Sequence, residues 1–128
     1  KENDLFACHA VKALMKHADC AEVVAHRDGT EIPEAFARCE KIIGARIHAI
    51  VLALRMEIPL YPLIFREKAR NLLKDIQYPF PVCDMDNLDK GALRTFLKES
   101  QPPYHLEEEI YVRANEHVRL FKQQLMNF

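Results

Sequence analysis

Apolar residues recur along the chain at spacings that change repeatedly between helical and extended patterns. The first pattern predicts a helix with one buried stripe, formed by Ala7, Val11, Leu14, Met15 and Ala18. A short strand is expected over residues 21–25, followed by a polar turn over 26–30. Pro33 then suits the opening turn of a second helix.

The middle of the chain carries the strongest pattern. A strand over residues 41–45 turns at Gly44 into a helix over 46–56, which is apolar on most of its circumference and is expected to pack under a sheet. The next strand is expected over 58–65. Because Pro62 lacks an amide donor, this strand should lie at a sheet edge or be interrupted there.

The remaining pattern continues the alternation. It predicts a helix near 69–76, an extended segment near Val82, a helix over 88–98 and, after Pro102-Pro103, a last helix from Leu106 to Leu125. Short strands alternating with helices predict an α/β fold. We expect a Rossmann-like parallel sheet of about four strands, with helices on both faces and a long C-terminal helix.

Composition and charge narrow the function classes. The chain has 128 residues, 49% of them hydrophobic and 29% charged, which fits one globular domain over residues 1–128. The net charge of -1 gives no field that favours nucleic acid or an anionic membrane. The longest apolar run, 49–54, is too short for a transmembrane segment. Four cysteines without a C-x-x-C pair indicate reduced thiols, so a cytoplasmic location is expected.

Candidate chemistry lies where strands are expected to end. In parallel sheets, ligands bind beyond the carboxyl ends of the strands. Arg46 and His48 open the helix after one strand, and His26 and Arg27 follow an earlier one. Arg46 could hold a carboxylate or phosphate through two parallel hydrogen bonds. Alternatively, Arg46 pairs with a nearby acid while His48 caps or packs, and spacing does not decide between the two. No metal site is expected, since His17 and Cys20 lack a second pair of ligands.

The segment over residues 40–59 resembles polysaccharide pyruvyl transferases. In that family a strand leads into Arg-Leu-His and an apolar helix, and then reaches a Gly-Ile/Val-Pro strand start. Here Gly44-Ala45-Arg46-Ile47-His48 opens the helix. The similarity continues through Phe65 to Lys68, includes the turn over 30–34, and spans about residues 23–76.

The resemblance implies an enzyme that moves the enolpyruvyl unit of phosphoenolpyruvate onto two hydroxyls of a sugar or glycolipid acceptor in exopolysaccharide biosynthesis. The products are a pyruvate ketal and phosphate. It also implies a two-domain fold like that of GT-B glycosyltransferases. This chain would be the C-terminal Rossmann-like half, inactive without an N-terminal domain that is absent from it.

The resemblance also implies roles for particular residues. Arg46, the Ile47 backbone and His48 would contact phosphoenolpyruvate, and Lys68 would lie near the cleft. His48 would act as general acid or only as a hydrogen-bonding group. His26 and Arg27 are possible further cleft residues. No cofactor is implied, because phosphoenolpyruvate is the donor substrate.

Two other functions remain open. One is the nucleotide-sugar domain of another GT-B enzyme or an epimerase, although such sites usually cradle a diphosphate with Gly-rich loops and this chain has only 3 glycines. The other is a non-catalytic α/β interaction module whose last helix docks on a partner.

Overall fold

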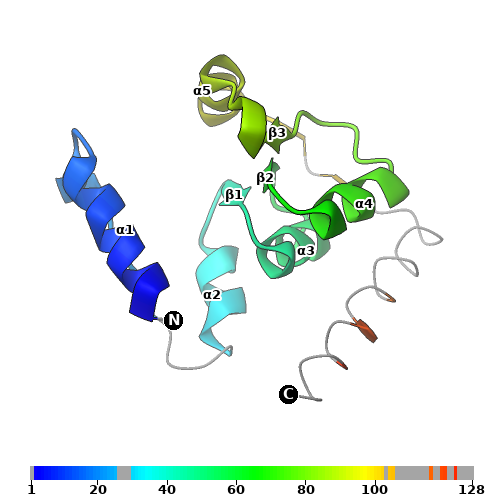
Figure 1. Ribbon diagram of the computed structural model, residues 1–128, viewed down its shortest axis with the longest axis horizontal. Helices are drawn as coiled ribbons and strands as arrows, with labels where there is room; N and C mark the ends of the chain where they lie inside the picture. Colours follow the sequence, from blue (N-terminus) through cyan, green and yellow to red (C-terminus); the bar gives the residue numbers. More distant parts are fainter. Residues whose placement is uncertain are drawn as a thin grey trace. The chain divides into compact units, whose positions relative to one another are not determined.

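The structure, a computed structural model, describes residues 2–25, 30–102, 104–105, 116, 119–120 and 123. The chain divides into two compact units, Lys1–Glu34 and Ala35–Phe128. Figure 1 shows helix α1 (Glu2–Leu14) in the first unit and a small parallel sheet with its helices in the second. Helix α2 (Glu31–Ala37) crosses the boundary between the units.

The first unit confirms the predicted helix and corrects two other predictions. The stripe expected to be buried on α1 is exposed, with accessible fractions of 60% for Val11 and 88% for Leu14. A segment of this length has too little chain to enclose a core around one helix. The strand expected over residues 21–25 does not form. These residues follow a short 3-10 helix, η1 (Ala18–Cys20), and pair with no strand.

The second unit follows the predicted alternation closely. Its elements after α2 are β1 (Ile42–Gly44), α3 (Ile47–Arg55), β2 (Leu60–Ile64), α4 (Glu67–Asp75), β3 (Cys83–Asp84), the 3-10 helix η2 (Met85–Asn87) and α5 (Lys90–Lys98). The class is therefore α/β, as predicted. The described residues form a sheet of three strands rather than four, because the segment over 21–25 contributes none.

The sheet is parallel, with the order β1-β2-β3. Ile42 lies opposite Leu60 in the first pair, and Leu63 lies opposite Cys83 in the second. Since the strand order runs in one direction, right-handed crossovers place α3 and α4 on the same face. Both helices indeed contribute to one core cluster.

Of the two alternatives predicted for Pro62, the edge position does not hold, because β2 is the central strand, whereas the pairing of β2 with β3 does stop short of Pro62. The amide of Ile42 donates to Pro59 O at 2.9 Å, so the odd-numbered residues of β2 direct their backbone groups toward β1. Pro62 therefore faces β3. Pairing with β3 begins only at Leu63. No hydrogen bond of this short ladder therefore needs the amide donor that Pro62 lacks.

The two faces of the sheet carry different helices, which confirms the prediction of helices on both faces for this unit. Leu60 and Ile64 of β2 belong to the core cluster under α3 and α4. This cluster also contains the fully buried side chains of Ile50, Leu72 and Ile76. Because successive side chains of a strand point to opposite faces of the sheet, Tyr61 lies on the other face. There it packs with Cys83 and with Phe96 of α5.

Helices α3 and α4 end in the same way. Glu57 and Gln77, just beyond them, have φ values of 55° and 54°. The amide of Ile58 donates to Ala53 O at 3.0 Å, and that of Tyr78 donates to Leu73 O at 2.9 Å. These are Schellman-type ends, which turn the chain sharply toward the following strand.

The predicted C-terminal helix lies mostly outside the described residues. Glu116, Arg119, Leu120 and Gln123 are described there, and all four are helical. Within the described part of the chain, no helix combines the length and the apolar character needed to cross a membrane.

Candidate functional site at the carboxyl edge of the sheet

Three strands of the second unit end at one edge and lead directly into helix N-termini. β1 runs into α3, β2 into α4, and β3 into η2. Because the strands are parallel, these three transitions lie at the same edge of the sheet, where α/β proteins bind ligands. We call this set of transitions the carboxyl edge.

The turn from β1 into α3 is held close to the neighbouring strand. A Cβ atom added at the buried Gly44 would approach Leu60 Cδ1 to 3.3 Å and Ile50 Cγ1 to 3.5 Å. The Leu60 side chain would therefore have to shift slightly to admit a side chain at Gly44, while Ile50 would stay at an ordinary contact distance. The small residue keeps the start of α3 next to the sheet edge, where Arg46 and His48 follow.

Both long helices at this edge have an arginine at the N-cap. Arg46 (φ -88°, ψ 142°) precedes α3 and Arg66 (φ -134°, ψ 143°) precedes α4, and neither side chain caps its helix. A guanidinium group carries only donors, so it has no atom that could accept a bond from the first-turn amides. By contrast, Asp89 caps α5 by accepting a hydrogen bond from Ala92 N at 3.0 Å.

Two arginine caps beside two helix N-termini favour an anionic ligand. The first-turn N–H groups of a helix need acceptors, and the helix dipole adds positive potential at the same point. Where the cap residue is Asp, the protein supplies that acceptor itself. At α3 and α4 the cap residue is instead a cation, and a carboxylate or phosphate bound there can accept hydrogen bonds from both the first-turn amides and a guanidinium group.

His48 and Ile47 occupy the first turn of α3 in different ways. The Ile47 side chain packs partly buried against the core, so only its backbone is oriented by the turn toward the edge. Partial burial of the His48 imidazole lowers its pKa from the ordinary 6.5, so the ring is neutral at pH 7. An anion bound beside it would raise the pKa again.

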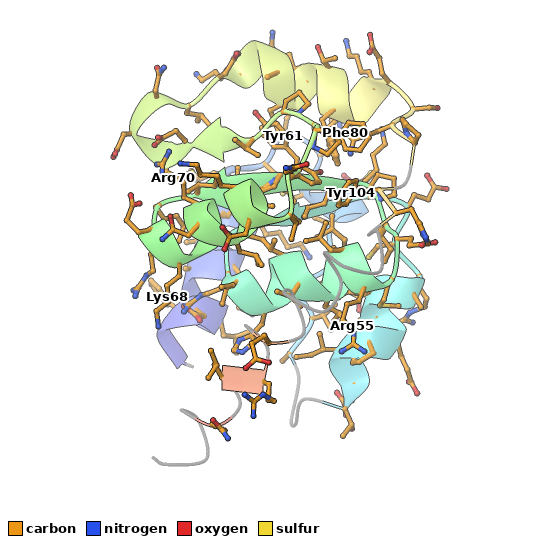
Figure 2. All side chains as sticks on the ribbon, turned by 90° about the vertical axis from the view of Figure 1, so that its right-hand side faces the viewer. Arg55, Tyr61, Lys68, Arg70, Phe80 and Tyr104 are labelled. Carbon is orange, nitrogen blue, oxygen red and sulfur yellow. The ribbon has the colours of Figure 1, made fainter. Side chains whose placement is uncertain are left out.

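Lys68 lies in the first turn of α4, with its side chain exposed. Figure 2 shows Lys68 and Arg70 on the same side of the view, away from Phe80 and Tyr104. Lys68 thus occupies the position in the first turn of α4 that His48 occupies in α3, on the neighbouring crossover. The structure therefore gathers Arg46, His48 and Lys68 at this edge by topology.

Arg70 and Asp84 form an ion pair between α4 and the end of β3. Arg70 Nη2 donates to Asp84 Oδ2 at 2.8 Å, and Glu67 Oε1 lies 3.4 Å from Arg70 Nε. The bond from Arg70, and then the amide of Asp86, lowers the pKa of Asp84. Arg70 is therefore paired with the protein's own carboxylates.

Of the residues at this edge, Arg46, His48 and Lys68 are predicted as site residues from the sequence. Arg66, Arg70 and Asp84 were not predicted as site residues. A usable signal existed for Asp84, the first acidic residue after a short apolar strand, and for Arg66, which occupies the same position before α4 as Arg46 does before α3.

His26 and Arg27 lie outside the described residues. Among the residues that are described, no group of three or more His, Cys, Asp or Glu side chains could hold a metal ion. The four cysteines are free thiols, three of them exposed and Cys83 buried.

The basic side chains at the carboxyl edge lie on the surface of the protein. Arg46, His48, Arg66 and Lys68 are all exposed to a substantial degree. Such a surface can hold a small dianion, and another wall would be needed to exclude water from a reaction there.

Comparison with protein-family models, curated proteins and solved structures finds no match for this chain.

Proposed function

We propose that the second unit binds phosphoenolpyruvate at the carboxyl edge, as the C-terminal domain of a polysaccharide pyruvyl transferase. The observation that carries the proposal is the pair of arginine N-caps on neighbouring parallel crossovers. Phosphoenolpyruvate has a phosphate and a carboxylate, so it offers acceptors for two separate donor groups. The resemblance over residues 40–68 supplies the identity of the ligand.

Each residue has a defined part in this proposal. Arg46 and the first-turn amides of α3 hold one anionic group, while Arg66 and Lys68 hold the other. Ketal formation joins C2 of phosphoenolpyruvate to two acceptor oxygens and releases phosphate. One hydroxyl proton goes to the methylene carbon and the other to the phosphate. His48, once protonated beside the bound anion, is placed to deliver one of these protons.

The remaining parts of the enzyme belong to the same proposal. A sugar or glycolipid acceptor would enter from an N-terminal domain that is absent from this chain, and that domain would cover the open edge. The reaction would take place in the cytoplasm, where phosphoenolpyruvate is made. The isolated chain should therefore bind the donor and not turn it over.

Calorimetric titration with phosphoenolpyruvate tests the proposal. Replacing Arg46 by Ala should weaken binding by about tenfold to a hundredfold, the value of one charge-assisted hydrogen bond of about 1.5–3 kcal/mol. Arg66→Ala should weaken it similarly. Arg94→Ala is the matched control, since it removes an exposed arginine from α5 and should leave binding unchanged.

Equal affinity of the wild type and Arg46→Ala would overturn the proposal. Displacement of phosphoenolpyruvate by uridine diphosphate at lower concentration would instead favour a nucleotide-sugar domain. The two ligands thus separate the two enzymatic interpretations.

A second candidate function is a non-catalytic interaction module that docks through the first unit, rather than through the last helix as the sequence predicts. An apolar groove of about 350 Å³ lies between α1 and the segment over residues 21–24, lined by Val11, Met15 and Val23 among others. Phe6 and Leu14 nearby are 77% and 88% exposed. If removing residues 1–25 abolished a complex while phosphoenolpyruvate showed no binding, the module would be the better account.

A further inference from the structure

The first unit carries an apolar face on α1, and the phosphoenolpyruvate proposal makes no use of it. Ala7, Val11 and Leu14 follow one another at spacings of four and three residues, so they lie along one side of the helix. Met15 N donates to Lys12 O at 3.1 Å, which continues the last turn as far as Met15. Val11, Leu14 and Met15 are 60%, 88% and 45% exposed. An apolar side with this spacing is typical of a helix that packs against another helix.

The first unit is too small to bury this face within itself. It comprises residues 1–34, and none of its described residues is buried. Units of fewer than about 40 residues usually depend on a disulfide, a metal or a partner chain for their stability. Cys8 and Cys20 are free, exposed thiols. A partner that covers α1 would supply the apolar burial that the unit lacks.

An apolar groove lies beside the exposed side chains of this face. Its volume is about 350 Å³, and its lining includes Ala7, Cys8, Val11 and Met15. Leu14 lies on the same side of the helix, one turn after Val11. The unit therefore presents an exposed apolar side chain next to an apolar groove. A contact between two copies across a two-fold axis uses both, because each copy places its side chain in the groove of the other.

The sizes of the side chains along this face favour one direction for the partner helix. Small residues, Ala7 and Cys8, lie near its beginning, and large residues, Leu14 and Met15, lie at its end. In an antiparallel pair centred on Val11, Leu14 of one copy is level with Cys8 of the other, and Met15 is level with Ala7. Large side chains then meet small ones, as close packing requires. A parallel pair would instead place large against large and small against small.

The charges along α1 favour the same direction. Asp4 lies near the beginning of the helix, and Lys12 and Lys16 lie near its end. An antiparallel pair brings the acidic beginning of each helix toward the basic end of the other, and the two helix dipoles run in opposite directions. A parallel pair would bring like charges together, within the distance of about 10 Å over which charges interact at ordinary ionic strength.

We infer that the protein forms a two-fold symmetric dimer in which α1 packs antiparallel against α1 of a second copy of this chain, centred on Val11. Leu14 of each copy fills the groove of the other, beside Ala7 and Cys8. Because the contact is small, the dissociation constant should be on the order of 10–100 μM. The dimer does not depend on phosphoenolpyruvate binding, so either proposal can fail without the other.

Sedimentation equilibrium of the full chain, at concentrations that span this dissociation constant, tests the dimer. The mass should rise from that of one chain to that of two. Leu14→Glu should weaken association at least about tenfold, because it brings a charge into an apolar contact. The matched control is Leu97→Glu, which introduces the same charge at a 54% exposed leucine of α5 and should leave the dissociation constant unchanged.

Ala7→Leu tests the direction of the pairing. In the antiparallel dimer the new leucine meets Met15 and occupies the groove that Leu14 needs, so association should weaken at least about threefold. Leucine is a good helix former, so this weakening cannot come from loss of the helix. Adding Met15→Ala restores one large and one small residue to each contact and should recover most of the affinity. A parallel pair would respond in the opposite way, because Ala7→Leu would place two leucines in contact.

Amide-detected NMR at increasing protein concentration locates the contact. The amides of Val11 and Leu14 should shift with concentration, and that of Leu97 should not. The inference is overturned if the chain keeps the mass of one copy at all these concentrations, since another segment or protein must then cover α1. It is also overturned if Leu97→Glu weakens association as much as Leu14→Glu, or if Ala7→Leu strengthens it.

Discussion

The carboxyl edge and the face of the sheet covered by α5 belong to one small sheet but have opposite surroundings. At the edge, helix N-termini and exposed cations meet solvent, and arginine occupies the cap positions of α3 and α4. Under α5, aromatic walls enclose a buried phenol, and the helix N-terminus is capped by Asp89. The cap residue thus determines whether the first-turn amides of a helix receive an acceptor from the side chain of the cap itself, as at α5, or receive none from it, as at α3 and α4.

The largest expected effect tests whether both regions depend on the same core. Leu72 of α4 is fully buried in the cluster under α3 and α4. Leu72→Ala should lower the free energy of unfolding by about 2–5 kcal/mol, through lost burial and the space left behind. Urea unfolding should report the loss equally from probes at both regions. The control Leu97→Ala, at a 54% exposed position on α5, should cost less than about 0.5 kcal/mol.

Exchanging the N-cap residues of α4 and α5 tests how the cap affects the free energy of unfolding and the binding of phosphoenolpyruvate. Arg66 already has the extended backbone that an Asp cap requires. Arg66→Asp should therefore raise the free energy of unfolding by about 1 kcal/mol while weakening phosphoenolpyruvate binding. The converse change, Asp89→Ala at α5, should cost about 1 kcal/mol and leave phosphoenolpyruvate affinity unaltered. A loss of stability in Arg66→Asp would contradict the account of the caps.

A substitution just after the C-terminal end of α4 should change the free energy of unfolding by less and leave the affinity for phosphoenolpyruvate unchanged. Gln77 has a positive φ that disfavours residues with a Cβ atom. Gln77→Gly should raise the free energy of unfolding by about 0.5–1 kcal/mol, after the greater freedom of glycine in the unfolded chain is included. Thermal unfolding measures this gain in stability. An unchanged or lower melting temperature would show that the positive φ of Gln77 does not destabilise the protein.

The smallest effect concerns pH. Because burial lowers the folded-state pKa of His48, the unfolded chain binds the proton more readily. The stability contributed by neutral His48 is therefore present above pH 6.5 and declines as pH falls through the lowered folded pKa. A bound anion reverses the preference, so phosphoenolpyruvate affinity should rise a few-fold as pH falls from about 7.5 to about 6. His48→Gln should remove the part of this rise that exceeds the ligand's own phosphate titration.

Long apolar runs made the second unit predictable from sequence. The helix α3 and the strands on either side are so apolar that burial and element type follow from composition and length. The strand expected over residues 21–25 failed because a short apolar run forms a strand only where a partner strand lies beside it. Pro62 predicted either an edge strand or an interrupted one, and the sequence could not decide between them because the length of β3, which the pattern did not indicate, determines which backbone groups of β2 need partners.

The candidate site was predicted in part for a similar reason. Arg46, His48 and Lys68 follow predicted strands, so sequence places them at the carboxyl edge. The Arg70 and Asp84 pair joins residues 14 apart, and a cavity under α5 joins Tyr61 to Gln101, so both depend on packing that no local spacing encodes.

The most direct measurement of the central claim is an amide-detected NMR titration of the chain with phosphoenolpyruvate. The account predicts that the largest saturable shifts occur at the first-turn amides of α3 and α4, namely Ile47, His48, Glu67 and Lys68. The first-turn amides Lys90 and Gly91 of the Asp-capped α5 should stay unmoved and serve as the internal reference. Shifts of equal size at α5, or no saturable shift at α3 and α4, would contradict the account.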